Sequence, residues 1–278
     1  MLPLCGWRAL CVPGWPGLFP RRVEIDAGGY MTKTLPIRMT YMRFTSCSGC
    51  QLMLLNCEEQ LAPLSMLVSI HEFPLASSST TPTEQIELAL VEGSISTPDE
   101  LTRLLNLRRR VKLLVAVGSC ALSGGINSLV AGERAEAINE VYGQVQADLH
   151  SFPPQPVHRF VTVDCQVPGC PPERHDLLEA LCSMHYGGWP GRQLMPVCME
   201  CRILENPCLL MENKLPCLGP VTLAGCRARC PSLGVVCEGC RGDVTEANHG
   251  EMFRLLLDTG LSESDAHRRM ARFAGGVS

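Results

Sequence analysis

Along residues 35 to 185, apolar segments typical of strands alternate with segments whose apolar positions have helical spacing. The run VKLLVAVG at 111–118 is continuously apolar, which is typical of a strand buried on both faces of a sheet. Residues 97–110 have a helical pattern and open with Thr-Pro-Asp, a capping residue followed by proline in the first turn. In all, we predict strands at 37–44, 65–73, 86–93, 111–118 and 159–165, and helices at 49–61, 97–110 and 171–185. Strands that alternate with helices predict an α/β fold with a doubly wound parallel sheet.

The pattern changes after about residue 190. Residues 196–240 hold eight of the seventeen cysteines and have almost no periodicity, so we expect that this segment cannot form an apolar core of its own. Two short helices are predicted beyond it, at 245–260 and 261–275, and the second opens with a capping box from Ser262 to Asp265. We therefore expect three parts: a disordered extension at 1–34, an α/β domain at 35–190, and a cysteine-rich domain with C-terminal helices at 191–278.

Composition and charge exclude several classes of protein. The chain has 278 residues, of which 46% are hydrophobic and 19% charged, as in globular proteins rather than disordered ones. Its net charge of −4 gives no general attraction for nucleic acid. One basic run, from Arg108 to Lys112, comes at the end of a predicted helix, where it interacts favourably with the helix dipole. We therefore predict no nucleic-acid partner.

The number of cysteines requires either disulfides or metals. The first thirty residues lack a basic start followed by a continuous apolar stretch, and the pair Arg21 and Arg22 follows the apolar part, the reverse of an export signal. No apolar run approaches the roughly 20 residues that span a bilayer. These features favour a cytoplasmic location, where clustered cysteines are expected to be metal ligands.

Four cysteines come at the ends of predicted strands or in the loops that follow them. Cys47 and Cys50 follow the first strand, Cys120 follows the buried strand at 111–118, and Cys170 precedes a helix. Because the carboxyl ends of parallel strands lie along one edge of the sheet, these four thiols can converge there. Four thiolates suit a tetrahedral zinc ion or a cubane iron–sulfur cluster. The alternative for Cys120 and Cys170 is that they are small buried hydrophobic residues.

Eight further cysteines divide most simply into two sets of four, in sequence order. The sets are Cys198, Cys201, Cys208 and Cys217, then Cys226, Cys230, Cys237 and Cys240. Each set contains a single Cys-x2-Cys pair, whereas zinc ribbons usually have two pairs for one site. The spacing therefore favours iron–sulfur clusters and leaves zinc open. Eight inert thiols at this density are not expected.

Of the remaining cysteines, Cys57 and Cys182 follow helical apolar patterns and are expected in the core. Cys165 lies in a predicted strand, which favours packing, while Cys5 and Cys11 fall in the extension. Glu92, at the end of an apolar strand on the same sheet edge as the cysteines, is a candidate proton relay. Its alternative is a solvated glutamate at a strand end.

Four motifs carry a family resemblance. TSCSGCQ, LVEGSI, VGSCALSGGI and VPGCPP, in this order and at these intervals, resemble the small, electron-transferring subunit of nickel–iron hydrogenases. The tail from 206 to 242 is similar to the cytoplasmic branch, which comprises the NAD(P)-linked, sulfhydrogenase-type delta subunits and the F420-non-reducing hydrogenase small subunit. The ending CEGCRGDVTEAN with two helices after it favours the delta type. The resemblance covers roughly residues 38–275.

The resemblance implies a flavodoxin-like domain and three [4Fe–4S] clusters. It places a proximal cluster on Cys47, Cys50, Cys120 and Cys170, a distal cluster on Cys198, Cys201, Cys208 and Cys217, and a medial cluster on Cys226, Cys230, Cys237 and Cys240. Many exported hydrogenases have a histidine where this chain has Cys198, and only three medial cysteines, to which Cys230 adds a fourth. The fourth thiolate implies a four-iron rather than a [3Fe–4S] medial centre, with a lower reduction potential.

The implied function is electron relay. Hydrogen is split at the nickel–iron site of a separate large subunit, and electrons pass to a partner with flavin/NAD(P)-binding and iron–sulfur subunits, with Glu92 aiding proton movement. The alternative within the family is an F420-non-reducing hydrogenase subunit that feeds a heterodisulfide-reductase-like partner.

Three rivals lie outside this interpretation. The nickel–iron subunit itself ends in Asp-Pro-Cys-x2-Cys-x2-His, and VVCEGCRGD has neither the Asp-Pro nor the histidine. The related quinone-side subunit of respiratory complex I has adjacent cysteines at its first ligand position and lacks the cysteine-rich tail. A zinc-stapled scaffold module is the third, and metal content separates it from the iron–sulfur interpretation.

Overall fold

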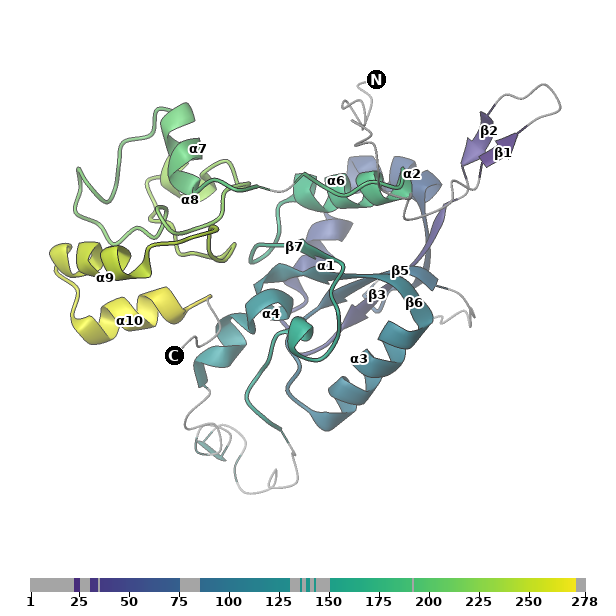
Figure 1. The fold of residues 1–278 in the computed structure, drawn as a ribbon, viewed down its shortest axis with the longest axis horizontal. Coiled ribbons are helices and arrows are strands. Elements are labelled where there is room, and N and C mark those ends of the chain that lie inside the picture. The colour runs from purple at the N-terminus through teal and green to yellow at the C-terminus, as the bar shows by residue number, and fades with distance from the viewer. Residues whose placement is uncertain are drawn as a thin grey trace.

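A five-stranded parallel sheet forms the centre of the domain that precedes the cysteine-rich part (Figure 1). The computed structural model describes residues 23–25, 31–34, 36–75, 86–130, 151–191 and 193–273, with four single positions between 131 and 150. The strands of the sheet are β3 (Ile37–Arg43), β4 (Val68–Glu72), β5 (Ile86–Glu92), β6 (Val111–Val117) and β7 (Cys165–Val167). Their spatial order, β4-β3-β5-β6-β7, is the flavodoxin-like order 2-1-3-4-5. The predicted doubly wound α/β fold is therefore confirmed.

Helices cover both faces of this sheet (Figure 1). One face carries α1 (Gly49–Leu55), α2 (Glu58–Leu67) and α6 (Arg174–His185), and the other carries α3 (Pro98–Arg110) and α4 (Gly118–Ser123). All seven residues of β5 are buried because both of its faces are covered. Leu88 and Leu90 point to the first face and Ala89 and Val91 to the second, as the two-residue period of a strand requires.

Both ends of α3 are capped as the sequence predicts. The Thr97 side chain accepts a hydrogen bond from the Glu100 backbone N–H at 3.2 Å. At the other end, Arg108, Arg109 and Arg110 occupy the last turn, and Arg108 donates to the carbonyl of Val111 at 3.1 Å. The basic run thus ends a helix, as the sequence predicts.

Three predicted elements are wrong in their extent. The strand predicted at 65–73 begins only at Val68, because residues 65–67 end α2. The helix predicted at 49–61 is divided at Asn56 into α1 and α2, and asparagine is a residue that favours helix ends over interiors. The strand predicted at 159–165 is mostly irregular, and only Cys165–Val167 pairs with β6. The apolar residues that suggested a longer strand, Phe160, Val161 and Val163, instead pack against the core on the α3 face.

The cysteine-rich part has an apolar core that residues 196–240 share with the C-terminal helices. Its helices are α7 (Val197–Ile203), α8 (Arg229–Ser232), α9 (His249–Asp258) and α10 (Glu263–Ala271). Met252, Leu256 and Ala266 from the last two helices complete a core with Leu218 and Val221 from the irregular segment. The apolar faces of α9 and α10 thus supply what residues 196–240 lack. The N-cap half of the predicted capping box is present, since Ser262 accepts from the Asp265 N–H at 3.1 Å, while the Asp265 carboxylate accepts from the Ser262 hydroxyl at 2.7 Å.

A pair of short strands precedes the sheet. In it β1 (Val23–Ile25) pairs with β2 (Met31–Thr34) in antiparallel orientation (Figure 1). The predicted disordered extension at 1–34 otherwise falls outside the described residues, so it stays a prediction. Within the described part of the chain, no helix is long and apolar enough to cross a membrane.

Candidate functional site

Four cysteines meet at the carboxyl edge of the sheet, where the strand order reverses between β3 and β5. Cys47 and Cys50 follow β3, Cys120 lies in α4 directly after β6, and Cys170 follows β7. Burial raises the pKa of the Cys50 thiol, and the negative charges of Glu92, Cys120, Cys170 and Cys47 raise it further. Each of the other three thiols is thus close enough to influence Cys50. The convergence expected of a doubly wound sheet is present in the structure.

Glycines leave room beside these sulfurs. A Cβ atom on Gly118 would lie 2.4 Å from the Cys50 Sγ, and one on Gly125 would lie 3.0 Å from the Cys120 Sγ. Both glycines have positive φ, +82° and +58°, which side chains with a Cβ rarely adopt. The backbone therefore approaches the thiols more closely than any other residue type would allow.

Glu92 lies beneath the same thiols and is 1% exposed. Its carboxylate accepts hydrogen bonds from the Gln51 N–H at 3.0 Å, the Cys50 N–H at 3.4 Å and the Tyr41 hydroxyl at 3.2 Å. Burial and the neighbouring carboxylate raise the pKa of Tyr41 well above its ordinary value. The alternative of a solvated strand-end glutamate is wrong. Sequence reasoning missed Tyr41, although its position two residues before the end of β3, on the buried face, was a usable signal.

The first set of tail cysteines surrounds the start of α7. Burial, together with the charges of Cys217, Cys201 and Cys208, raises the pKa of Cys198 to about 12. A Cβ atom on Gly219 would lie 3.2 Å from the Cys198 Sγ and 3.6 Å from the Cys217 Sγ. The other three thiols of this set therefore lie near Cys198.

The second set lies between the first set and the sheet edge. Burial, together with the charges of Cys226 and Cys230, raises the pKa of Cys240 to about 11. Cys237 is the most buried member, with a pKa that burial raises to about 12. Its backbone N–H donates to the Cys217 Sγ at 3.2 Å, so Cys217 contacts both sets.

Cys240 connects the second set to the sheet-edge set. A hydrogen bond from the Cys170 backbone N–H lowers the pKa of the Cys240 thiol and partly offsets the effect of burial. The Ser119 hydroxyl, next to Cys120, donates to the Cys240 carbonyl. The three sets therefore form a continuous series, from the sheet edge through the second tail set to the first.

The donor chemistry of the three sets fits iron–sulfur clusters. Every cysteine in the described ranges is a free thiol. Within those ranges, no group of three Cys, His, Asp or Glu side chains is arranged to hold a single metal ion. In an iron–sulfur cluster each thiolate binds a different iron, so four sulfur donors from separate loops are suitable.

The other cysteines pack as predicted where they can be followed. Cys57 and Cys182 are buried at 0% and 8% exposure. Cys165 starts β7 and packs against the core on the α1 and α6 face. Cys5 and Cys11 lie outside the described residues.

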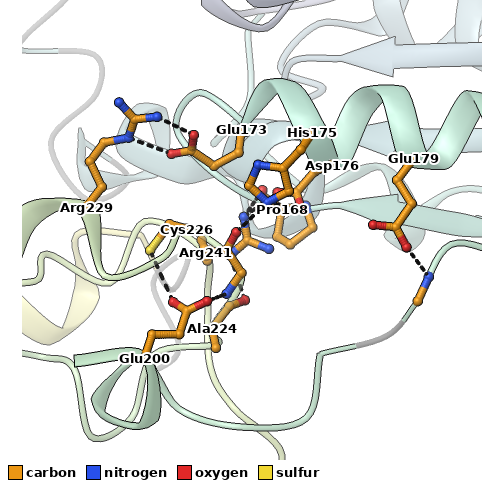
Figure 2. Close-up of polar contacts among 12 residues, drawn as sticks. Pro168, Glu173, His175, Asp176, Glu179, Glu200, Ala224, Cys226, Arg229 and Arg241 are labelled. Atoms are coloured by element: carbon orange, nitrogen blue, oxygen red, sulfur yellow. Dashed lines mark hydrogen bonds and ion pairs between the residues drawn. The ribbon is translucent and has the colours of Figure 1, made fainter. Parts of the chain in front are cut away.

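The start of α6 holds the tail against the sheet domain (Figure 2). Asp176 binds the guanidinium of Arg241 at 2.5 Å, and Glu173 pairs with Arg229. His175 Nε2 lies 2.9 Å from the carbonyl of Gly225. Sequence reasoning missed these residues, and the acidic first turn of α6 directly after Cys170 was the only local signal.

Glu200 connects the two tail sets (Figure 2). It lies between Cys198 and Cys201 on α7, and its carboxylate accepts from the backbone N–H of Gly225 at 2.9 Å and of Ala228 at 3.0 Å. The loop around Cys226 is thus held by a side chain from the first set.

The fold and these sites define a class: a flavodoxin-like protein with one cysteine set on its sheet edge and two in a cysteine-rich tail. The family model described as NADH ubiquinone oxidoreductase, 20 Kd subunit, matches residues 47–184. The delta subunit of sulfhydrogenase 2 from Pyrococcus furiosus is 36% identical over 238 residues, which are 86% of this chain and 99% of that protein. The G subunit of the vhu F420-non-reducing hydrogenase from Methanocaldococcus jannaschii is 30% identical over 240 residues, 75% of this chain and 83% of that protein.

A solved structure has the same fold. The [NiFeSe]-hydrogenase of Dm. baculatum aligns with a TM-score of 0.52 and 19% identity, over 74% of this chain and 94% of that chain. The chain belongs to the family of hydrogenase small subunits that includes these archaeal delta and G subunits. It is therefore a member of an oxidoreductase complex with a large-subunit partner, and its family and its cysteines indicate iron–sulfur cofactors.

Proposed function

We propose that this chain is the electron-transfer subunit of a cytoplasmic [NiFe] hydrogenase and holds three [4Fe–4S] clusters. When bound, the clusters supply one-electron transfer between the large subunit's nickel–iron site and a flavin/NAD(P)-binding, iron–sulfur partner. The observation that carries the proposal is the continuous series of three cysteine sets, with Cys240 in contact with the Cys120 and Cys170 loops. A series of adjacent sites suits relay, whereas a scaffold would not need the sets to touch.

The ligand assignment follows the three sets. The proximal ligands are Cys47, Cys50, Cys120 and Cys170, the medial ligands Cys226, Cys230, Cys237 and Cys240, and the distal ligands Cys198, Cys201, Cys208 and Cys217. The proximity of the thiols within each set supports this division. Cys217 and Cys237 are in contact across the two tail sets, so exchanging these two ligands is the alternative assignment to test first.

Glu92 is proposed to hold or move a proton next to the proximal set. Its burial and its hydrogen bond from the Tyr41 hydroxyl support this role, because a buried carboxylate with an exchangeable O–H neighbour can pass a proton. The backbone N–H groups of Cys50 and Gln51 hold the carboxylate in place.

A second candidate partner is a heterodisulfide-reductase-like complex. The match to the G subunit of the F420-non-reducing hydrogenase, at 30% identity, supports this alternative. The match to the delta subunit of the NAD-reducing hydrogenase HoxS from Cupriavidus necator, 26% identical over 161 residues, supports the flavin/NAD(P) partner.

Anaerobic purification of the native complex tests both the cluster content and the identity of the electron-transfer partner. We expect broad absorbance near about 400 nm and about twelve irons per chain, the content of three four-iron clusters. About three zinc atoms and no such absorbance would instead establish the zinc-stapled scaffold. Co-purification of a subunit with a dinucleotide-binding fold would support the NAD(P) branch, and a heterodisulfide-reductase-like subunit would establish the alternative.

A further inference from the structure

A buried arginine links residues 224–241, which carry the medial cysteines and are called the medial segment, to residues 168–170, the loop that ends in Cys170 and is called the proximal loop. Arg241 directly follows Cys240, and its side chain is only 3% exposed. Its guanidinium donates to the Ala224 carbonyl at 2.9 Å, to the Pro168 carbonyl at 3.2 Å and to Asp176 at 2.5 Å (Figure 2). Ala224 lies two residues before Cys226, and Pro168 lies two residues before Cys170. The Arg241 side chain therefore connects the backbone just before a medial cysteine with the backbone just before a proximal one.

The surrounding backbone is shaped to this guanidinium. A Cβ atom on Gly225 would lie 2.3 Å from Arg241 Nη2 and 2.8 Å from its Cζ. Gly225 has a φ of +121°, and its N–H is held by Glu200 at 2.9 Å. The glycine before Cys226 thus lets the peptide lie directly against the charged group. Arginine suits this place because its planar fork can serve three acceptors from one fixed position.

The charge of Arg241 lies next to two medial cysteines. Arg241 directly follows Cys240, and its guanidinium packs against Gly225, the residue before Cys226. Asp176, from the first turn of α6, supplies the compensating negative charge, and its side chain is 16% exposed. A buried arginine without such a partner would leave an uncompensated positive charge beside the medial set.

We propose that Arg241 and Asp176 are positioning residues that fix the medial segment against the proximal loop and set the reduction potential of the medial centre. This inference rests on the proposed function, since it requires a redox centre at the medial cysteines. Reduction adds an electron to that centre, so a nearby positive charge favours the reduced form and raises the potential. With Asp176 ionised, the pair is neutral, and the potential stays low.

The direction of the change in reduction potential can be tested by removing first the Asp176 charge and then both charges. Asp176→Asn keeps an oxygen that can accept from Arg241 but removes the negative charge, so Arg241 is left uncompensated. We expect the potential of one centre to rise by about 59 mV, which corresponds to a tenfold change in a one-electron equilibrium. In Asp176→Asn/Arg241→Gln both charges are absent, and the potential should return towards that of the wild type.

Glu173→Gln is the matched control. It makes the same carboxylate-to-amide change in the same segment, and Glu173 also pairs with an arginine of the medial segment. That arginine, Arg229, is 65% exposed, so solvent screens its charge. We expect the control to leave all the potentials close to those of the wild type.

The measurement is a redox titration of the anaerobically purified complex, followed by electron paramagnetic resonance, with iron content determined for each variant. A raised potential in Asp176→Asn that the double variant reverses would support the inference. A double variant that departs further from the wild type would assign the pair a purely structural role and overturn the inference. Unchanged potentials in Asp176→Asn with normal iron content would overturn the inference alone. A wild-type complex without cluster signals would overturn the inference and the proposed function together.

Discussion

Gly118 lies where β6 gives way to α4, and replacing it with alanine is expected to damage the proximal site. Its φ is +82°, and an added Cβ would lie 2.4 Å from the Cys50 Sγ and 3.5 Å from the Gly169 carbonyl oxygen. Cys50 is 8% exposed, so its sulfur has little free space to move into. The sulfur would have to turn away from the other proximal thiols, or the backbone of Gly118 would have to shift.

Two features of the site contribute to the expected loss of stability in Gly118→Ala: the positive φ and the lack of space for a Cβ. The positive φ costs an L-residue about 1–2 kcal/mol. Extra volume in a packed site adds about 1–3 kcal/mol. We therefore expect Gly118→Ala to lower the free energy of unfolding by about 2–5 kcal/mol, the sum of these two contributions. Gly260→Ala is the matched control, because Gly260 has a φ of +91° and no atom within 4 Å of its added Cβ.

Urea unfolding of the anaerobic holoprotein, together with iron analysis, measures both effects. The midpoint of Gly118→Ala should fall clearly below that of Gly260→Ala, and only Gly118→Ala should lose iron from the proximal site. Equal midpoints and equal iron contents would refute the close approach of Gly118 to Cys50.

Two further substitutions test the site. Cys230→Pro should yield a [3Fe–4S] signal in electron paramagnetic resonance with a raised potential, because a thiolate is lost while proline is tolerated in the first turn of α8. An unchanged four-iron spectrum would show that Cys230 is not a medial ligand. Glu92→Gln keeps an acceptor for the Gln51 N–H but cannot carry a proton, so hydrogen turnover should fall by about a hundredfold at unchanged iron content. Turnover at the wild-type rate would remove Glu92 from the proton path.

The sequence predicted those elements whose pattern is local. β5 and β6 are continuous apolar runs, and α3 combines a Thr97 cap with a basic end, so neighbours along the chain suffice to define them. The segment at 159–163 has the same apolar composition as a strand, but its side chains pack into the core on the α3 face. Whether such residues pair or pack is decided by distant partners, which a local pattern does not contain.

The same distinction applies to the site. The thiols could be predicted because cysteines at this density are expected to bind metal in a reducing compartment. Arg241 and Asp176 could not, because their pairing joins positions 65 residues apart and neither residue type is unusual at its own place in the sequence. Their importance comes from burial and from shared acceptors, which only the folded chain provides.

The first turn of α6 explains how the two halves can act as one unit. Within six residues of Cys170, Glu173, His175 and Asp176 all contact the segment that carries Cys226, Cys230 and Cys240. The helix is anchored in the sheet core through Leu177 and Leu181. Consequently, α6 holds the medial segment at a defined position relative to β7, the strand that precedes Cys170. The separation of the proximal and medial sets therefore depends on this helical turn, together with the contacts of Ser119 and Pro168 to residues 240 and 241.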